Sequence, residues 1–183
     1  MLVVGDSLSA EYGLKRGSGW VALLEARLAQ QKIAARVVNA SISGDTTSGG
    51  RTRLPALLTQ HRPDVVVLEL GGNDALRGLP LAMTRTNLDA MAKASKAGGA
   101  KVLIAGMQLP PNYGRQYGEQ FAALFATVAK AEGAALVPFL LKGVADGPQA
   151  DTLFQPDRIH PTAAAHPTIL DNVWPVLEPL LKR

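Results

Sequence analysis

The chain contains no cysteine, and this single absence removes several kinds of chemistry. Disulfide bonds, thiolate catalysis and cysteine-ligated zinc are all excluded. Aromatic residues are also scarce, at 5% of 183 residues, and the 19 Lys and Arg are dispersed among 15 Asp and Glu. Without a stacking platform or a basic stripe, we expect no nucleic-acid partner.

Long hydrophobic runs are missing as well. No stretch reaches the roughly 20 uninterrupted apolar residues that a membrane span needs, so we expect no stable membrane insertion. The apolar start at residues 1–4 has no basic region before it, so no signal peptide is visible. Because the first strand begins so abruptly, we expect that a few residues, and a leader, are missing from this version of the chain.

The remaining composition is that of a globular protein. Hydrophobic residues make up 47% of the chain, and Gly and Pro are scattered without a repeat, low-complexity tract or linker. At this length we expect one domain over residues 1–183 with a substantial core, and we expect a monomer.

Apolar, β-branched runs alternate with segments of helical periodicity. The expected strands cover residues 2–4, 36–39, 65–70, 101–105 and 135–137. The expected helices cover residues 20–28, 81–97 and 121–128, with a last helix from near Pro161, since proline is tolerated in a first turn. The alternation predicts an α/β fold, a three-layer α/β/α sandwich with a flavodoxin-like central parallel sheet of about five strands. Such sheets bind ligands at the carboxyl ends of their strands.

Ser7 follows the first expected strand directly, in the run GDSLS at residues 5–9. A serine in a tight turn entered through glycine is exposed at the sheet edge, as in a nucleophile elbow, although the G-x-S-x-G pattern is not met. The alternative is an ordinary strand-to-helix turn in which Ser7 or Ser9 caps a helix.

Two further strand ends carry candidate donors. Gly44 follows the second strand and lets the backbone approach a ligand closely, although residues 45–48 also suit a helix cap. Asn73 follows the third strand behind two glycines, which clear space around its amide. The alternative for Asn73 is a glycine-rich turn in which its side chain bonds its own backbone.

Asp157 and His160 lie three residues apart near the C-terminus. The carboxylate can accept from one imidazole nitrogen while the other faces outward, which selects the tautomer that a general base needs. The alternative is that Asp157 caps the helix expected from Pro161 and that His160 is merely exposed. We expect His61 to be solvated and His166 to lie on the surface, and we expect no metal site.

These four blocks, in this order, resemble the GDSL family of esterases and lipases within the SGNH hydrolase superfamily. The resemblance covers nearly the whole chain. Residues 39–46, 53–58 and 68–74 look closest to the bacterial thioesterase I, protease I and lysophospholipase type. The resemblance implies a serine hydrolase of carboxylic esters and thioesters, such as acyl-CoA thioesters, aryl esters and lysophospholipids. It also implies an enzyme without a cofactor, in the periplasm of a Gram-negative bacterium.

The resemblance also implies a role for each motif residue. Ser7 becomes the nucleophile, and Asp157 and His160 complete a catalytic triad. The backbone N–H groups of Ser7 and Gly44 and the side-chain amide of Asn73 become the donors of an oxyanion hole.

Two apolar segments are expected at the same sheet edge and are candidates for an acyl-binding groove. The expected groove residues are Leu76, Leu79, Pro80, Leu109, Pro110 and Tyr113. Loops at this edge are where function concentrates, although these side chains could instead cover the ends of the core.

Two other functions are compatible with parts of the pattern. A carbohydrate acetyl esterase of the same superfamily would share the catalytic residues and differ in its pocket. A non-catalytic, flavodoxin-like module that binds phosphate or a nucleotide would explain the glycines and the net charge of +4, but not the pair Asp157 and His160.

Overall fold

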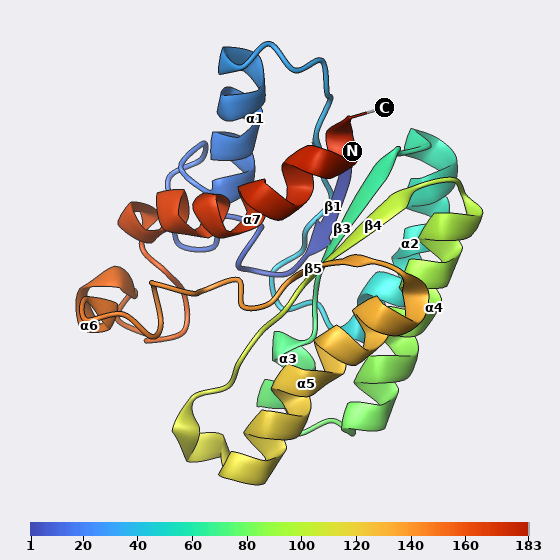
Figure 1. Ribbon diagram of the computed structural model, residues 1–183. Coiled ribbons are helices and arrows are strands. Elements are labelled where there is room, and N and C mark those ends of the chain that lie inside the picture. The colour runs from blue at the N-terminus through green and yellow to red at the C-terminus, as the bar shows by residue number, and fades with distance from the viewer. Residues whose placement is uncertain (183) are drawn as a thin grey trace.

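The computed structural model describes residues 1–182 and contains one parallel sheet (Figure 1). Its five strands are β1 (Leu2–Gly5), β2 (Val38–Asn39), β3 (Val65–Glu69), β4 (Lys101–Ala105) and β5 (Ala135–Val137). They lie in the order β2-β1-β3-β4-β5, and each neighbouring pair is parallel. The predicted parallel sheet is confirmed, with a second strand shorter than expected.

Helices cover both faces of this sheet. The helices are α1 (Trp20–Gln30), α2 (Thr47–His61), α3 (Gly72–Leu76), α4 (Leu81–Ala97), α5 (Arg115–Glu132), α6 (Ala150–Leu153) and α7 (His166–Leu181), with short 3₁₀ turns at Pro111–Tyr113 and Ala163–Ala165. Helices α1 and α7 pack together on one face, and α2, α4 and α5 pack on the other (Figure 1). This is the predicted three-layer sandwich.

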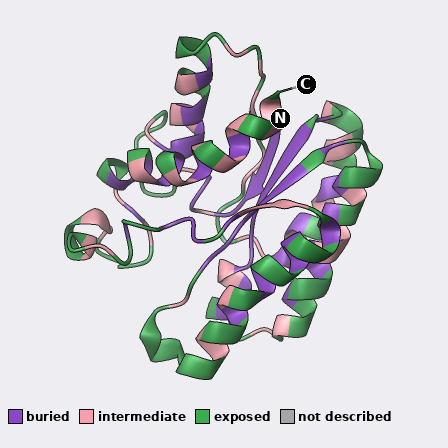
Figure 2. Cartoon of the chain, viewed as in Figure 1, coloured by how far each residue is buried: buried purple, intermediate pink, exposed green. Residues whose placement is uncertain are grey.

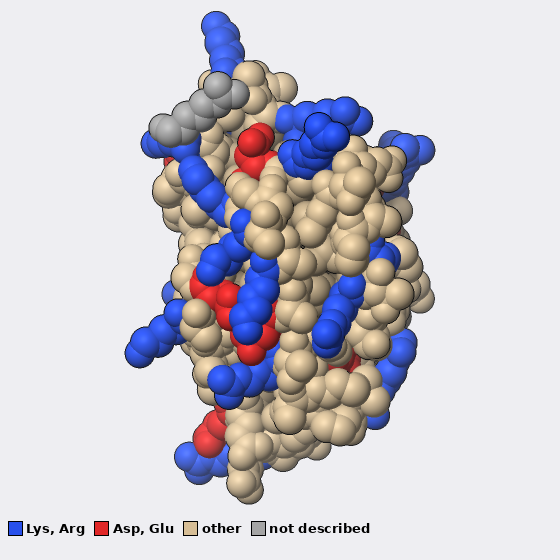
Figure 3. Space-filling view, turned by 90° about the vertical axis from the view of Figure 1, so that its right-hand side faces the viewer, with Lys and Arg blue, Asp and Glu red and all other residues tan. Residues whose placement is uncertain are grey.

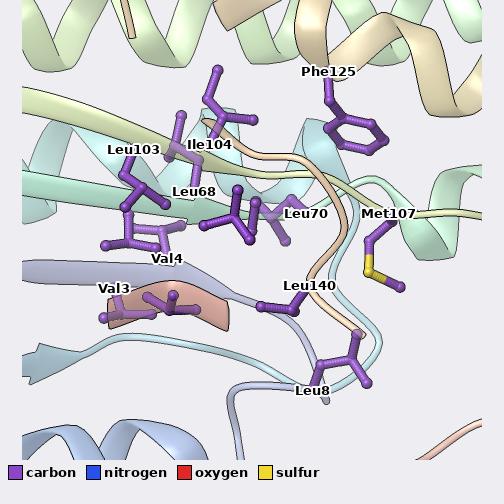
Figure 4. Packing of buried hydrophobic residues seen from close by; sticks show 14 of the residues in the cluster. Val3, Val4, Leu8, Leu68, Leu70, Leu103, Ile104, Met107, Phe125 and Leu140 are labelled. Atoms are coloured by element: carbon purple, nitrogen blue, oxygen red, sulfur yellow. The ribbon is translucent and has the colours of Figure 1, made fainter. Parts of the chain in front are cut away.

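The central strands are mostly apolar because both of their faces are covered. All residues of β1 and β3 are buried (Figure 2). Val4, Leu68 and Ile104 lie side by side in β1, β3 and β4. Leu8 and Leu70 extend this core past the carboxyl ends of the strands (Figure 4). The segments that follow β1 and β3 are therefore anchored in the core.

The last helix begins later than expected. Pro161 forms an isolated antiparallel bridge with Phe154, and α7 starts at His166 with Pro167 in its first turn. A proline does lie in the first turn of this helix, as expected, but it is Pro167 and not Pro161.

The expectation of a surface position for His166 is wrong. The side chain is 2% exposed, and its Nδ1 accepts a hydrogen bond from the backbone N–H of Trp20 at 2.8 Å. Trp20 begins α1, whose N-cap residue Gly19 has no side chain to offer. His166 therefore caps α1 from across the fold, and burial lowers the pKa of its imidazole.

Charged side chains are dispersed over the face that α2 and α4 cover. Figure 3 shows Lys and Arg spread over this face, with acidic groups and uncharged surface between them. None of the helices within residues 1–182 combines the length and the apolar composition that crossing a bilayer requires.

Candidate active site

The carboxyl ends of neighbouring strands bring three of the predicted residues to one edge of the sheet. Ser7 follows β1, Gly44 follows β2 and Asn73 follows β3, and these three strands are adjacent. Asp157 and His160 arrive from the loop between α6 and α7. The structure thus gathers all five residues from four separate segments of the chain.

Ser7, His160 and Asp157 form a continuous hydrogen-bonded chain. His160 Nε2 lies 2.8 Å from Ser7 Oγ, and His160 Nδ1 lies 2.6 Å from Asp157 Oδ2. With Nδ1–H donating to the carboxylate, Nε2 is free to accept the hydroxyl proton of Ser7. This is the arrangement of a nucleophile, a general base and an orienting group.

Asp157 is the most exposed of these three residues, and the backbone of the turn that follows it fixes its side chain. Its Oδ1 accepts hydrogen bonds from the backbone N–H groups of Ile159 at 2.9 Å and His160 at 3.0 Å. Partial burial acts to raise the pKa of Asp157, but the amides of His160 and Ile159 and the His160 ring outweigh it and lower the pKa to about 2. The carboxyl group is therefore ionised at neutral pH.

The loop that carries His160 is tied to the rest of the protein by a few contacts. Gln155 donates from its backbone N–H to the carbonyl of His160 at 2.7 Å, and its side chain donates to the carbonyls of Tyr12 and Pro161 at 2.9 and 3.0 Å. The ring of Tyr12 stacks on the imidazole of His160 with 4.2 Å between centroids. Sequence reasoning missed Tyr12 and Gln155, because no local pattern shows that they meet.

The three N–H donors expected for an oxyanion hole lie at the same edge of the sheet as Ser7. The side-chain amide of Asn73 donates to the carbonyl of Asp45 at 2.9 Å and to Asp6 Oδ2 at 3.3 Å, so it lies between the neighbours of Gly44 and Ser7. Among residues 1–182, the backbone N–H groups of Ser7 and Gly44 donate to no protein acceptor. Gly44 has φ 80°, a left-handed conformation that favours glycine.

A buried side chain, Asp74, connects the segment after Gly44 to the helix that contains Asn73. Asp74 is fully buried and accepts hydrogen bonds from the backbone N–H of Thr47 at 2.8 Å, from the Thr47 hydroxyl, and from the Thr84 hydroxyl at 2.8 Å. It thereby joins the start of α2 to α3 and α4. The N-cap of α2 is Thr46, which accepts from the backbone N–H of Gly49, as the helix-cap alternative foresaw.

A largely apolar cavity of about 480 Å³ reaches Arg158 and Ile159, which lie between Asp157 and His160 in sequence. Four of the six expected groove residues line it, and the other walls come from residues that the sequence did not indicate. The apolar part of the lining consists of Leu76, Leu109, Pro110 and Tyr113 together with Met107, Phe121, Phe139, Leu141, Phe154 and Ile159, and polar side chains come from Gln108, Asp146 and Arg158.

Two of the expected groove residues lie elsewhere, so for them the expectation needs correction. Leu79 and Pro80 do not line the cavity. The carbonyl of Leu79 accepts a hydrogen bond from the Tyr117 hydroxyl at 3.4 Å, and Pro80 is the N-cap of α4. They lie where the segment after α3 turns into the next helix.

The remaining histidines lie apart from Ser7. His61 is partly exposed at the end of α2, and His166 caps α1. Within residues 1–182 no three His, Asp or Glu side chains are grouped as a metal site requires.

Comparison with known proteins places this geometry in a family. Residues 3–167 match the model of the GDSL-like lipase/acylhydrolase family. The chain is 56% identical to esterase TesA of Pseudomonas aeruginosa over 99% of its length and 89% of the relative. It is 44% identical to thioesterase 1/protease 1/lysophospholipase L1 of Escherichia coli, over 99% of the chain and 84% of the relative.

Solved structures agree with the sequence relatives. The crystal structure of TesA matches with a TM-score of 0.94 and 55% identity, covering 98% of each chain. The psychrotrophic esterase EstA from Pseudoalteromonas sp., inhibited by monoethylphosphonate, matches with a TM-score of 0.92 and 38% identity, over 100% and 98% of the two chains. This chain therefore belongs to the GDSL-like lipase/acylhydrolase family, and it is a serine ester hydrolase.

Proposed function

We propose that Ser7 is the nucleophile of this hydrolase, with His160 as its general base and Asp157 as the group that orients His160. The observation that carries this proposal is the hydrogen-bonded chain from Ser7 Oγ through the imidazole to Asp157, beside an apolar cavity. A non-catalytic phosphate-binding module would not require this series of hydrogen bonds between a serine, a histidine and an aspartate.

The reaction follows from the placement of these groups. His160 Nε2 takes the proton of Ser7 as Oγ attacks the substrate carbonyl, and Asp157 stabilises the resulting imidazolium. The N–H groups of Ser7 and Gly44 donate to the oxyanion, and the Asn73 amide joins them by exchanging its longer hydrogen bond, to Asp6, for one to the oxyanion. His160 then returns the proton to the departing alcohol or thiol, which leaves an acyl-enzyme on Ser7. Water, deprotonated by His160, hydrolyses that ester and frees the serine.

The cavity favours substrates with an apolar acyl chain. Its side chains are mostly aliphatic or aromatic, and each methylene that enters such a site contributes up to about 0.8 kcal/mol, or about a fourfold gain in kcat/KM. The relatives are named as an esterase and as a thioesterase and lysophospholipase. Acyl thioesters, aryl esters and lysophospholipids are accordingly the proposed substrate classes.

A chain-length series tests the nucleophile and the cavity together. We expect kcat/KM for p-nitrophenyl and CoA esters to rise from acetyl to octanoyl. We expect Ser7→Ala to lose at least about 10³-fold in kcat and all labelling by a serine-directed phosphonate. A label on Ser9 or Ser43 would reassign the nucleophile, and a preference for acetyl esters would favour a carbohydrate esterase.

The pH dependence of the reaction tests the base. A general base acts in its unprotonated form, so we expect kcat/KM to rise with pH. A flat profile across neutral pH would contradict a histidine base.

Two properties of the whole protein are also part of the proposal. The named relatives come from Gram-negative bacteria, and we propose that the mature enzyme acts in the periplasm as a monomer. Cell fractionation of a tagged full-length protein and light scattering of the purified enzyme test these two points separately.

A further inference from the structure

Glu69 is a buried carboxyl group that the mechanism above does not use. It ends β3, is 1% exposed, and pairs in register with Gly5 of β1, two residues before the nucleophile. A Cβ atom at Gly5 would lie only 2.8 Å from Glu69 Oε1, so the absence of a side chain at Gly5 makes room for this carboxyl group. Glu69 thus lies directly behind the turn that carries Ser7.

The hydrogen bonds of Glu69 lead to that turn from two sides. Its Oε1 accepts from the hydroxyl of Ser9 at 2.6 Å and from the backbone N–H of Asp6 at 3.4 Å. The indole N–H of Trp20 donates to the same Ser9 hydroxyl at 3.1 Å. Glu69 therefore connects the start of α1 to the residues on both sides of Ser7.

Asp6 extends this network to the oxyanion hole. Its Oδ1 accepts from the backbone N–H of Leu8 at 3.0 Å, and its Oδ2 accepts from the side-chain amide of Asn73 at 3.3 Å. We propose that Glu69 is a positioning residue that acts through Asp6 and Ser9 to hold Ser7 and Asn73 in the geometry of the acyl transfer. This inference rests on the proposed roles of Ser7 and Asn73.

Glu69 and Asp6 are adjacent buried carboxyl groups, and their protonation states determine how Glu69 acts. Burial and the neighbouring Asp6 raise the pKa of Glu69 well above its usual value, and burial raises the pKa of Asp6 to about 6. Glu69 Oε2 is buried without a hydrogen-bond partner among the described residues, which a neutral carboxyl group tolerates better than a carboxylate. Glu69 accordingly carries the proton, and Asp6 carries the charge that orients the Asn73 amide.

Two substitutions separate this positioning role from a need for negative charge. Glu69→Gln keeps a neutral group of the same shape that accepts from Ser9, so we expect kcat within about threefold of wild type and an unchanged pH profile. Glu69→Leu removes the acceptor, and we expect kcat to fall about 10- to 100-fold with KM changed less than about threefold. Rates are expressed per active site, counted by phosphonate titration.

Glu132 offers a matched control. It is a buried glutamate at the end of α5, paired with Lys93 and Lys96, at the end of the fold away from Ser7. We expect Glu132→Leu to lower Tm without changing kcat per site. If Glu69→Leu does not fold, Ser9→Ala replaces it, with an expected loss of about 3- to 10-fold in kcat at constant KM.

Each outcome decides the inference. Unchanged kcat in Glu69→Leu, or in Ser9→Ala where that variant replaces it, would show that Glu69 only supports the fold. A Glu69→Gln variant as slow as Glu69→Leu, or one with a shifted pH profile, would show that a negative charge on Glu69 is needed and would overturn its assignment as the protonated member of the pair. Neither result changes the assignment of Ser7 as the nucleophile, because the Ser7→Ala variant tests that assignment independently.

Discussion

The two halves of the active site are built in different ways. Ser7, Gly44 and Asn73 follow strands of the central sheet, and buried carboxyl groups, Glu69 and Asp74, lie behind them. The other half lies on an irregular loop between α6 and α7, whose aspartate side chain is 36% exposed. The geometry of the first half therefore depends on the core, whereas that of the second depends on a few local hydrogen bonds. Substitutions should affect stability and rate together in the first half and rate alone in the second.

The largest effect in this comparison is expected from Asp157→Asn. The variant keeps an acceptor for the backbone amides but places an amide against His160 Nδ1, which selects the wrong tautomer, and we expect kcat to fall about 10²- to 10⁴-fold. Because the side chain is partly exposed and the variant keeps the acceptor for both backbone amides, Tm should stay within about 2 °C of wild type. Steady-state kinetics and calorimetry measure the two quantities. A loss below about threefold would mean that another acceptor orients His160.

The ionisation of Asp157 provides a pH check on the same half. A carboxyl group with a depressed pKa contributes stability that is present above its unfolded value of about 3.9 and is lost as the pH falls towards about 2. Asp157 therefore stays ionised throughout the neutral range. We therefore expect no loss of stability from this group between pH 8 and 6, and a loss that begins only as the pH falls below about 4, measured by chemical denaturation over this pH range.

The contrast between the halves also explains what the sequence could predict. The order of strands and helices was readable because the buried parallel strands are largely apolar. Ser7, Gly44 and Asn73 were singled out because they lie in the loops after strands, and the family resemblance supplied their expected roles. Asp157 and His160 were singled out by their three-residue spacing, and the resemblance supplied their expected roles. Tyr12 and His166 were missed or misplaced, because their contacts join segments more than 140 residues apart and no local spacing encodes them.

Asn73→Ala is expected to have the next largest effect. The amide is one of the three proposed oxyanion donors, and loss of one such donor costs about 10²- to 10³-fold in kcat. Asn73 is partly exposed at the start of α3, so the fold should remain intact by circular dichroism. Turnover equal to wild type would remove Asn73 from the mechanism.

Asp74→Ala tests whether the core supports the strand-built half. It leaves the backbone N–H of Thr47 buried without its acceptor, and we expect a loss of about 1–3 kcal/mol in the free energy of unfolding. Because α2 and α3 lose their common anchor, kcat should also fall about tenfold. Asp74→Asn retains an acceptor for this N–H and serves as the control, with a smaller loss in both measurements. Full stability in Asp74→Ala would contradict a supporting role for the carboxylate.

Gln155→Ala is the corresponding test for the loop-built half and should give the smallest effect. Its side-chain amide ties the histidine loop to the carbonyl of Tyr12, whose ring stacks on His160, while the bridge between Phe154 and Pro161 remains in the variant. We expect kcat to fall about 3- to 10-fold, because the imidazole is held less firmly over Ser7, with a change in unfolding free energy below about 1 kcal/mol. Chemical denaturation with parallel kinetics measures both. If instead Gln155→Ala unfolds as readily as Asp74→Ala, the histidine loop is part of the cooperative core, and the two halves differ only in solvent exposure.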